Sequence, residues 1–211
     1  MSELAQRTMI GVLLIGIALA AAVLDGYFFA GLVAIAACAM FYEWRRIVAG
    51  WGFGWQIAGF VYALLPAIAL LWVRDRSPIG LELLLWVFVI TWSVDIGAYF
   101  AGRAIGGPKL APAISPNKTW AGLLGGTLAA MVLGGLWATL LELPMILLWL
   151  AAPFAVAAQL GDLFESWLKR RAGVKDSGTW LPGHGGALDR LDGLVVVATL
   201  TAGAMIAGLI P

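Results

Sequence analysis

The sequence predicts an all-α, polytopic helical membrane protein with about seven transmembrane helices and a cytoplasmic N-terminus. Three observations predict this fold class. Hydrophobic residues make up 62% of the 211 residues and charged residues only 12%, whereas a typical soluble domain is about 25% charged. The apolar residues gather in runs close to the roughly 20 residues that a helix needs to cross a bilayer. Lysine and arginine are distributed unevenly among the connecting loops.

The predicted spans are residues 9–24, 27–42, 53–73, 83–101, 119–141, 145–160 and 194–210. The first two are short and meet at Asp25, which indicates a helical hairpin, and we interpret the first as a retained span and not as a removed signal peptide. The sixth is expected to continue as a helix to about residue 172, and the seventh to begin as early as residue 187. In the fifth, small residues recur every four positions and predict close packing on a neighbouring helix; they are Gly122, Gly126, Ala130 and Gly134.

The placement of lysine and arginine predicts the orientation of the chain. With the N-terminus in the cytoplasm, 11 of the 13 lysine and arginine residues fall in cytoplasmic segments, and only Arg74 and Arg76 lie on the opposite side. This asymmetry follows the positive-inside rule. The two longest polar loops, residues 103–118 and 173–186, then share the cytoplasmic side, where we expect them to meet beside Asp162.

Acidic residues next to the apolar runs are the strongest indication of chemistry. Asp162 and Glu165 lie three residues apart on a predicted helix, and Asp189 and Asp192 repeat this spacing, so each pair shares one helical face. Asp95 lies inside the fourth run. Because charge is expensive to hold in a membrane, such acids are functional candidates by default. Several carboxylates with a single histidine favour a hard cation, Mg²⁺, over zinc.

Cations near these acids are suited to phosphate, and the candidates are Lys118, Lys169, Arg170, Lys175 and Arg190. Residues 115–119 are expected to begin the fifth helix, whose free N–H groups would suit a phosphate, and the glycine-rich turn at residues 182–186 would let backbone approach one. Two structural alternatives stay open. The cations could serve orientation or anionic headgroups, and Glu165 could form an i,i+4 ion pair with Lys169.

Standard nucleotide-binding and hydrolase motifs are absent from the sequence. It contains no GxxxxGK[ST], no GxGxxG and no GxSxG, which argues against a P-loop, a dinucleotide fold and acyl-transfer hydrolysis. Phosphoryl or nucleotidyl transfer at metal-held carboxylates remains. The non-enzyme alternative is a membrane transporter, although the inverted repeats expected of one are not apparent.

The residues from Ser166 to Asp192 resemble the C-terminal signature of the phosphatidate cytidylyltransferases, or CDP-diacylglycerol synthases. The matching segments are SWLKR, KDSG, HGGA and DRLD, with Ala187 where a larger apolar residue is usual. Two further motifs of that family are matched by residues 115–122 (SPNKTWAG) and 95–103 (DIGAYFAGR). The resemblance covers about residues 95–193, and the preceding spans are similar in hydropathy only.

This resemblance implies transfer of CMP from CTP to phosphatidic acid, giving CDP-diacylglycerol and pyrophosphate in phospholipid biosynthesis. The implied ligands of Mg²⁺, with a second cation left open, are Asp162, Asp189, Asp192, Glu165 and Asp95. The phosphates would be held by Lys118, Lys169, Arg170, Lys175 and Arg190. His184 would hydrogen-bond a phosphate or a metal-bound water. Further substrate contacts are expected from Ser115, Asn117, Thr119, Gly185 and Gly186.

The same resemblance divides the chain into N-terminal membrane helices at residues 1–94, a scaffold on the lipid side, and a catalytic membrane region at residues 95–211. The expected partners are CTP, phosphatidic acid and membrane lipids, with no nucleic acid, and a homodimer is left open. We expect an integral protein of a bacterial inner membrane with its site facing the cytoplasm. Another CTP-dependent lipid cytidylyltransferase, or a lipid kinase, would use similar cations and carboxylates.

Overall fold

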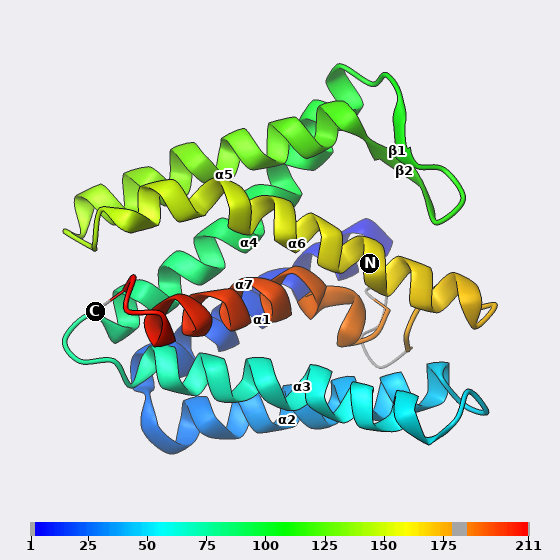
Figure 1. The fold of residues 1–211 in the computed structure, drawn as a ribbon, viewed down its shortest axis with the longest axis horizontal. Helices are drawn as coiled ribbons and strands as arrows, with labels where there is room; N and C mark the ends of the chain where they lie inside the picture. The colour runs from blue at the N-terminus through cyan, green and yellow to red at the C-terminus, as the bar shows by residue number, and fades with distance from the viewer. Residues whose placement is uncertain (1–2, 179–184, 211) are drawn as a thin grey trace.

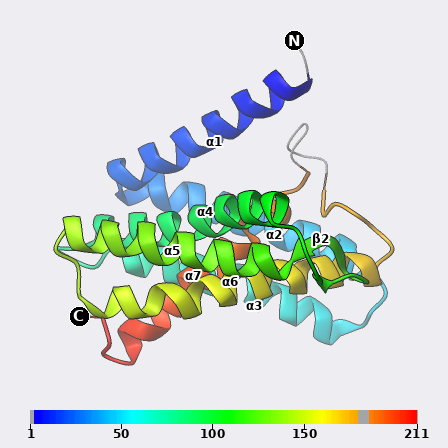
Figure 2. The same ribbon diagram turned by 90° about the horizontal axis from the view of Figure 1, so that it is seen from above.

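The computed structural model describes residues 3–178 and 185–210, which form seven helices and one β-hairpin. Figures 1 and 2 show the helices running back and forth as an elongated bundle, with α1 splayed away from the rest. In chain order the elements are α1 (Glu3–Leu24), α2 (Gly26–Ile47), α3 (Phe53–Arg74), α4 (Gly80–Ala104), β1 (Lys109–Ala111), β2 (Ser115–Thr119), α5 (Trp120–Leu140), α6 (Ile146–Arg171) and α7 (Leu188–Ile206).

The helices confirm the predicted fold class of an all-α, polytopic membrane protein. Five of them, α2 to α6, are long and apolar enough to cross a membrane, and α1 contributes a shorter apolar stretch, Thr8–Leu24. The first turns of α7 carry Asp189, Arg190 and Asp192, so its apolar part is short. As predicted, α1 and α2 form a hairpin at Asp25, and α6 continues as a helix to Arg171.

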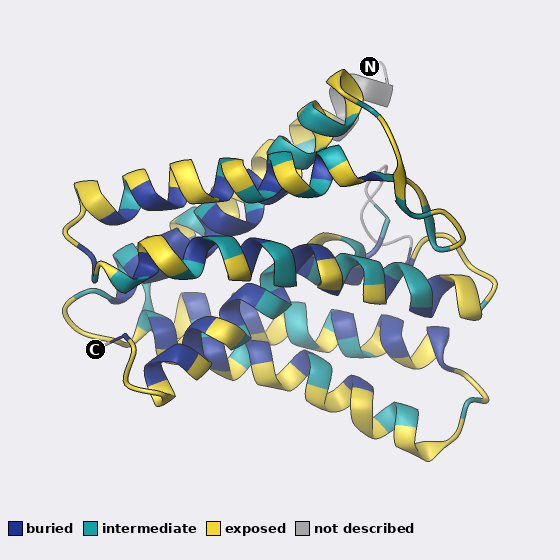
Figure 3. Ribbon diagram, turned by 45° about the horizontal axis from the view of Figure 1, so that its top comes forward, coloured by how far each residue is buried: buried dark blue, intermediate teal, exposed yellow. Residues whose placement is uncertain are grey.

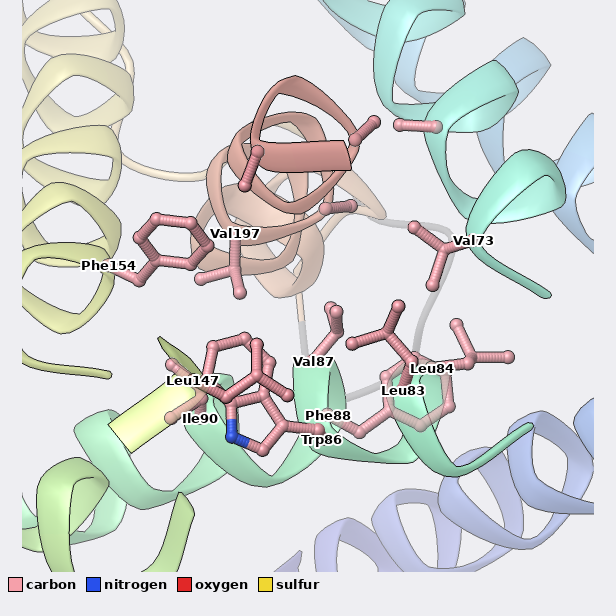
Figure 4. Close-up of a cluster of buried hydrophobic side chains, with 14 of the residues drawn as sticks. Val73, Leu83, Leu84, Trp86, Val87, Phe88, Ile90, Leu147, Phe154 and Val197 are labelled. Carbon is pink, nitrogen blue, oxygen red and sulfur yellow. The ribbon is translucent and has the colours of Figure 1, made fainter. Parts of the chain in front are cut away.

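The core of the bundle is built around α4. Leu83, Leu84, Trp86, Val87 and Ile90 are all fully buried on it. Figure 4 shows these side chains meeting residues of α3, α6 and α7. The outward faces of the bundle remain apolar, and Figure 3 shows exposed residues along the outer helices. Large apolar side chains such as Phe53 and Leu124 lie on that surface, which is how a protein surrounded by lipid tails is built.

The packing of α4 on α5 confirms the predicted small-residue stripe. A Cβ added at Gly126 would lie 2.7 Å from the carbonyl oxygen of Val94, and one at Gly122 would lie 3.1 Å from that of Ala98. Only glycine therefore lets the two backbones approach this closely. The end of α4 and the start of α5 are joined by the β1–β2 hairpin, so this close packing also fixes the base of the hairpin.

The segment before α5 differs from its prediction. Residues 115–119 were expected to begin the fifth helix, but they form strand β2, which pairs antiparallel with β1. Pro116 favours an extended conformation at Ser115, and the pairing of β2 with β1, with Thr119 opposite Lys109, keeps the following residues extended. The helix begins only after Thr119, whose hydroxyl caps it by accepting a hydrogen bond from the Gly122 N–H at 3.0 Å.

Candidate active site

Helices α6 and α7 pack against each other, and three of their carboxylates meet in one cluster. One oxygen each of Asp162, Glu165 and Asp192 lies within 4.8 Å of the others. Asp162 and Glu165 share a face of α6 because they are three residues apart. Gly161 lets α7 come close, since a Cβ there would lie 3.2 Å from the Asp192 carbonyl oxygen. We call these three residues the acid cluster.

The acid cluster has the chemistry of a site for a divalent cation. Its oxygen atoms are the ligands that Mg²⁺ prefers. Glu165 is buried and the other two are half-buried, and three neighbouring carboxylates at this depth repel one another unless a cation or a proton compensates them. The residues present therefore fit a divalent metal.

Lys118 reaches the acid cluster from the hairpin. Its ammonium nitrogen lies 2.5 Å from an Asp162 oxygen. The hairpin is held in place at two points: the Arg170 guanidinium donates to the Ile114 carbonyl at 3.2 Å, and the Trp120 N–H donates to the Pro108 carbonyl at 3.1 Å. The loop at residues 103–118 thus lies beside Asp162, as predicted. Residues 179–184 of the second loop, which was predicted to meet it there, lie outside the described residues.

Lys169 lies between two carboxylates. Its ammonium is 3.3 Å from Glu165 and 2.5 Å from Asp189, and the lysine is buried. The i,i+4 ion pair that the sequence left open is therefore present, and it coexists with the neighbouring metal-type cluster. Lys169 compensates the charge of two acids and joins α6 to the start of α7.

Asp189 lies apart from the acid cluster, and both of its oxygens have donors. One accepts from Lys169, and the other accepts from the backbone N–H groups of Ser177 at 2.9 Å and Gly186 at 2.8 Å. Burial acts to raise the pKa of Asp189, but the hydrogen bond from Lys169 and those from Gly186 and Ser177 outweigh it and lower that pKa from its ordinary value. Gly185 has a φ of +80° beside this carboxylate, a conformation that suits glycine.

Glu43 is the residue that sequence reasoning missed. It lies on α2 and is fully buried, and its carboxylate accepts hydrogen bonds from the Ser177 hydroxyl and from the N–H groups of Ala187 and Leu188. The only available signal was an acid at the edge of the second apolar run, and the adjacent Arg45 and Arg46 made it resemble an ordinary membrane boundary.

The other predicted residues are distributed around this centre. Asp95, on α4, is exposed and interacts electrostatically with Asp162 and Lys118. Lys175 is exposed in the loop after α6, and Arg190 is exposed on α7. Of the three predicted substrate contacts in β2, Thr119 is buried as the cap of α5, Ser115 is half-buried and Asn117 is exposed. His184 lies outside the described residues.

An apolar groove of about 520 Å³ runs between α3 and α7. Its lining includes Val195 and Val196, which follow Asp192 by one helical turn, so the groove begins next to the acid cluster. Tyr62 also lines it, and the Tyr62 hydroxyl oxygen is buried with no hydrogen-bond partner among the described residues. The ring of Tyr62 packs against Trp44 and Phe164.

The fold and the site together define a helical membrane protein with an acid cluster fitted to a divalent cation beside an apolar groove. The family profile described as "Cytidylyltransferase family" matches residues 49–207. The chain belongs to this family, which confirms the resemblance found in its motifs.

Individual relatives agree with this assignment. Over 172 residues the chain is 48% identical to the phosphatidate cytidylyltransferase of Brucella suis biovar 1 (strain 1330), covering 79% of this chain and 61% of that protein. It is 38% identical over 182 residues to that of Rickettsia bellii (strain RML369-C), covering 80% and 76%. It is 46% identical over 128 residues to that of Bacillus subtilis (strain 168), covering 59% and 48%. The chain thus spans 61% of the length of the Brucella protein.

Proposed function

We propose that this protein transfers CMP from CTP to phosphatidic acid and releases pyrophosphate. The observation that carries the proposal is the acid cluster with Lys118 against it, one helical turn along α7 from an apolar groove. Carboxylates for a metal, cations for a triphosphate and an apolar path for a lipid are the three requirements of this reaction. The relatives named phosphatidate cytidylyltransferase support the same assignment.

Asp162, Glu165 and Asp192 would hold Mg²⁺ in this proposal. When bound there, the metal would supply positive charge that stabilises the departing pyrophosphate. The sequence also suggested Asp189 and Asp95 as ligands. Because Lys169, Ser177 and Gly186 already donate to Asp189, we propose that Asp189 orients Lys169, and we keep Asp95 as a ligand candidate at the edge of the cluster.

The reacting groups need little proton transfer. An oxygen of the phosphatidate phosphate forms a bond to the α-phosphorus of CTP, and the bond from this phosphorus to the oxygen that bridges to the β-phosphorus breaks. Pyrophosphate leaves with the electron pair of that bond. Lys118, Arg170, Lys175 and Arg190 would hold the phosphates in line for this displacement. Because the attacking phosphate is already ionised, His184 is proposed to hydrogen-bond a phosphate and not to act as a base.

The lipid would enter along the α3–α7 groove. An acyl chain in the groove would be covered by apolar residues of both helices, and its headgroup would reach the acid cluster where Val195 and Val196 follow Asp192. The Tyr62 hydroxyl, which has no hydrogen-bond partner in the described part of the chain, is a donor for a phosphate oxygen. This arrangement leaves the glycerol phosphate at the end of the bundle where the hairpin lies.

The orientation in the cell and the assembly are part of the same proposal. The apolar helices and the relatives indicate an integral membrane protein. We propose the bacterial inner membrane, with the acid cluster facing cytosolic CTP, on the asymmetry of the lysines and arginines. A homodimer stays a prediction that a measurement of native mass in detergent would test.

The test is an assay of the purified chain in detergent with phosphatidic acid and CTP radiolabelled on either the α- or the γ-phosphate. The proposal predicts label in the lipid from α-labelled CTP alone, release of labelled pyrophosphate from γ-labelled CTP, and no transfer after chelation of divalent cations. Label in the lipid from γ-labelled CTP would indicate a lipid kinase. Absence of any CTP turnover with Mg²⁺ present would refute the proposal.

A further inference from the structure

Glu43 is a buried acid that contacts the region of the site from outside the residues matched by the family profile, which begin at residue 49. It lies on α2 with 0% of its surface exposed. One carboxylate oxygen accepts from the Ala187 N–H at 2.9 Å, and the other accepts from the Leu188 N–H at 2.9 Å and the Ser177 hydroxyl at 2.8 Å. Each oxygen of Glu43 therefore binds a backbone N–H.

These contacts make Glu43 the N-terminal cap of α7. The first N–H groups of a helix have no partner within it, and the residue at the cap position of α7 is Ala187, which has no side-chain oxygen to offer. Glu43 supplies that acceptor from another helix. The positive end of the helix dipole in turn favours the negative charge of Glu43, which lessens the cost of burying it.

A continuous chain of contacts leads from Glu43 to the acid cluster. The Ser177 hydroxyl lies between Glu43, at 2.8 Å, and Asp189, at 3.0 Å. Asp189 holds Lys169, and Lys169 lies 3.3 Å from Glu165 in the cluster. Any shift of Glu43 would thus move the start of α7, which carries Asp192, and the lysine beside Glu165.

Two glycines keep the surroundings of Glu43 tight. A Cβ at Gly178 would lie 2.5 Å from a Glu43 carboxylate oxygen. A Cβ at Gly186 would overlap both the Ser177 hydroxyl and the Glu43 carboxylate. The Glu43 carboxylate therefore lies between the backbone at Gly178 and the backbone at Gly186, and neither position has room for a side chain.

We propose that Glu43 is a positioning residue for CMP transfer, fixing the start of α7 and, through Ser177 and Asp189, the Lys169 ammonium beside the acid cluster. The inference rests on the proposed function and assigns a role there to a residue of the N-terminal scaffold. Glu43 touches neither substrate nor metal in this account. Its effect is on the geometry of the residues that do.

Glu43→Gln is the most informative substitution. Glutamine has the same shape but replaces one oxygen by an NH₂ donor, which would face the N–H of either Ala187 or Leu188. An unsatisfied buried donor costs enough that we expect kcat to fall about tenfold, with the KM values for CTP and phosphatidate changed less than about threefold. The matched control is Glu82→Gln, at the far end of α4, which should leave both kinetic constants unchanged.

Hydrogen–deuterium exchange supplies a second readout that needs no turnover. In Glu43→Gln the amides of Ala187 and Leu188 should exchange about tenfold faster, while those in the middle of α4 keep their rates. Gly186→Ala should show the same exchange pattern, and the control Gly203→Ala, where an added Cβ meets nothing within 4 Å, should not. If the unmodified protein transfers no CMP, the proposed function fails, but the exchange result still decides whether Glu43 caps α7.

The outcomes separate positioning from general stability. Lower kcat with near-constant KM and locally faster exchange support the proposal. A kcat of Glu43→Gln within about twofold of the unmodified protein, or equal acceleration of exchange across all helices, would overturn it. If Glu43→Gln does not purify as a folded protein, Ser177→Ala takes its place, because it keeps Glu43 and removes only the hydroxyl between Glu43 and Asp189. Full activity and unchanged exchange in Ser177→Ala would also overturn the proposal.

Discussion

Replacing Lys169 by methionine should strongly destabilise the protein, because it removes the cation between two buried acids. The side chains of Lys169, Asp189 and Glu165 are only 11%, 9% and 2% exposed. Methionine fills a similar volume but leaves both carboxylates without the ammonium. Removing one partner of a buried ion pair costs about 3–5 kcal/mol.

The loss should fall mainly on Glu165. Asp189 keeps its hydrogen bonds from Ser177 and Gly186, whereas Glu165 loses its own ammonium partner at 3.3 Å and stays beside Asp162 and Asp192. Since about 1 kcal/mol corresponds to a change in Tm of about 2–4 °C for a chain of this size, a cost of about 3–5 kcal/mol predicts a Tm lower by about 6–20 °C. Mg²⁺ should recover part of this loss, because a cation in the acid cluster would offset the charge of Glu165.

Thermal unfolding in detergent, followed by the fluorescence of the 11 tryptophans, measures this effect with and without Mg²⁺. The control is Lys109→Met, the same substitution at an exposed position in β1, where a surface change is worth no more than about 0.5 kcal/mol. A Tm of Lys169→Met within about 2 °C of the unmodified protein would refute the reasoning, because it would mean that the two acids do not need the lysine.

Three further substitutions probe the proposed roles in turnover. Asp192→Asn should abolish CMP transfer in a folded protein, because it removes a proposed metal ligand. The control, Asp75→Asn at the opposite end of the bundle, should keep its activity. A near-normal rate in Asp192→Asn at ordinary Mg²⁺ would make that carboxylate structural. Lys118→Ala should reduce kcat/KM for CTP more than Arg171→Ala does. Lys118 contacts the acid cluster, whereas Arg171 stacks on Trp51 and two further tryptophans. Equal losses would count against a phosphate role for Lys118. Tyr62→Phe should lower kcat/KM for phosphatidate by about threefold to tenfold, the value of one hydrogen bond, with no change in Tm; an unchanged kcat/KM would exclude its hydroxyl as a lipid contact.

The sequence predicted the helices well because their signals are local. Apolar runs, the Gly122 stripe and the length of α6 are all set by residues that are neighbours along the chain. The motifs at residues 95–103, 115–122 and 166–192 likewise directed attention to one end of the bundle. The error at residues 115–119 came from starting the helix before Thr119, because the pairing of β2 with β1 that keeps these residues extended is not apparent in their own sequence.

What the sequence could not predict is the pairing of groups far apart along the chain. Glu43 and Leu188 are 145 residues apart, and no local pattern links a lone acid in α2 to the start of α7. The same holds for Asp189, whose spacing from Asp192 suggested a second ligand pair. Its carboxylate accepts from Lys169, Ser177 and Gly186, and no local pattern in the sequence indicates these contacts.

The claim on which the rest depends is that Asp162, Glu165 and Asp192 hold a divalent cation. Electron paramagnetic resonance of Mn²⁺ added to the purified chain, without nucleotide, tests it most directly, because Mn²⁺ accepts the same oxygen ligands as Mg²⁺. The account predicts a bound Mn²⁺ signal that Mg²⁺ displaces, that is lost in Asp162→Asn and Asp192→Asn, and that is kept in Asp75→Asn. Mn²⁺ binding that survives both substitutions in the acid cluster, or no binding by the unmodified chain, would contradict it.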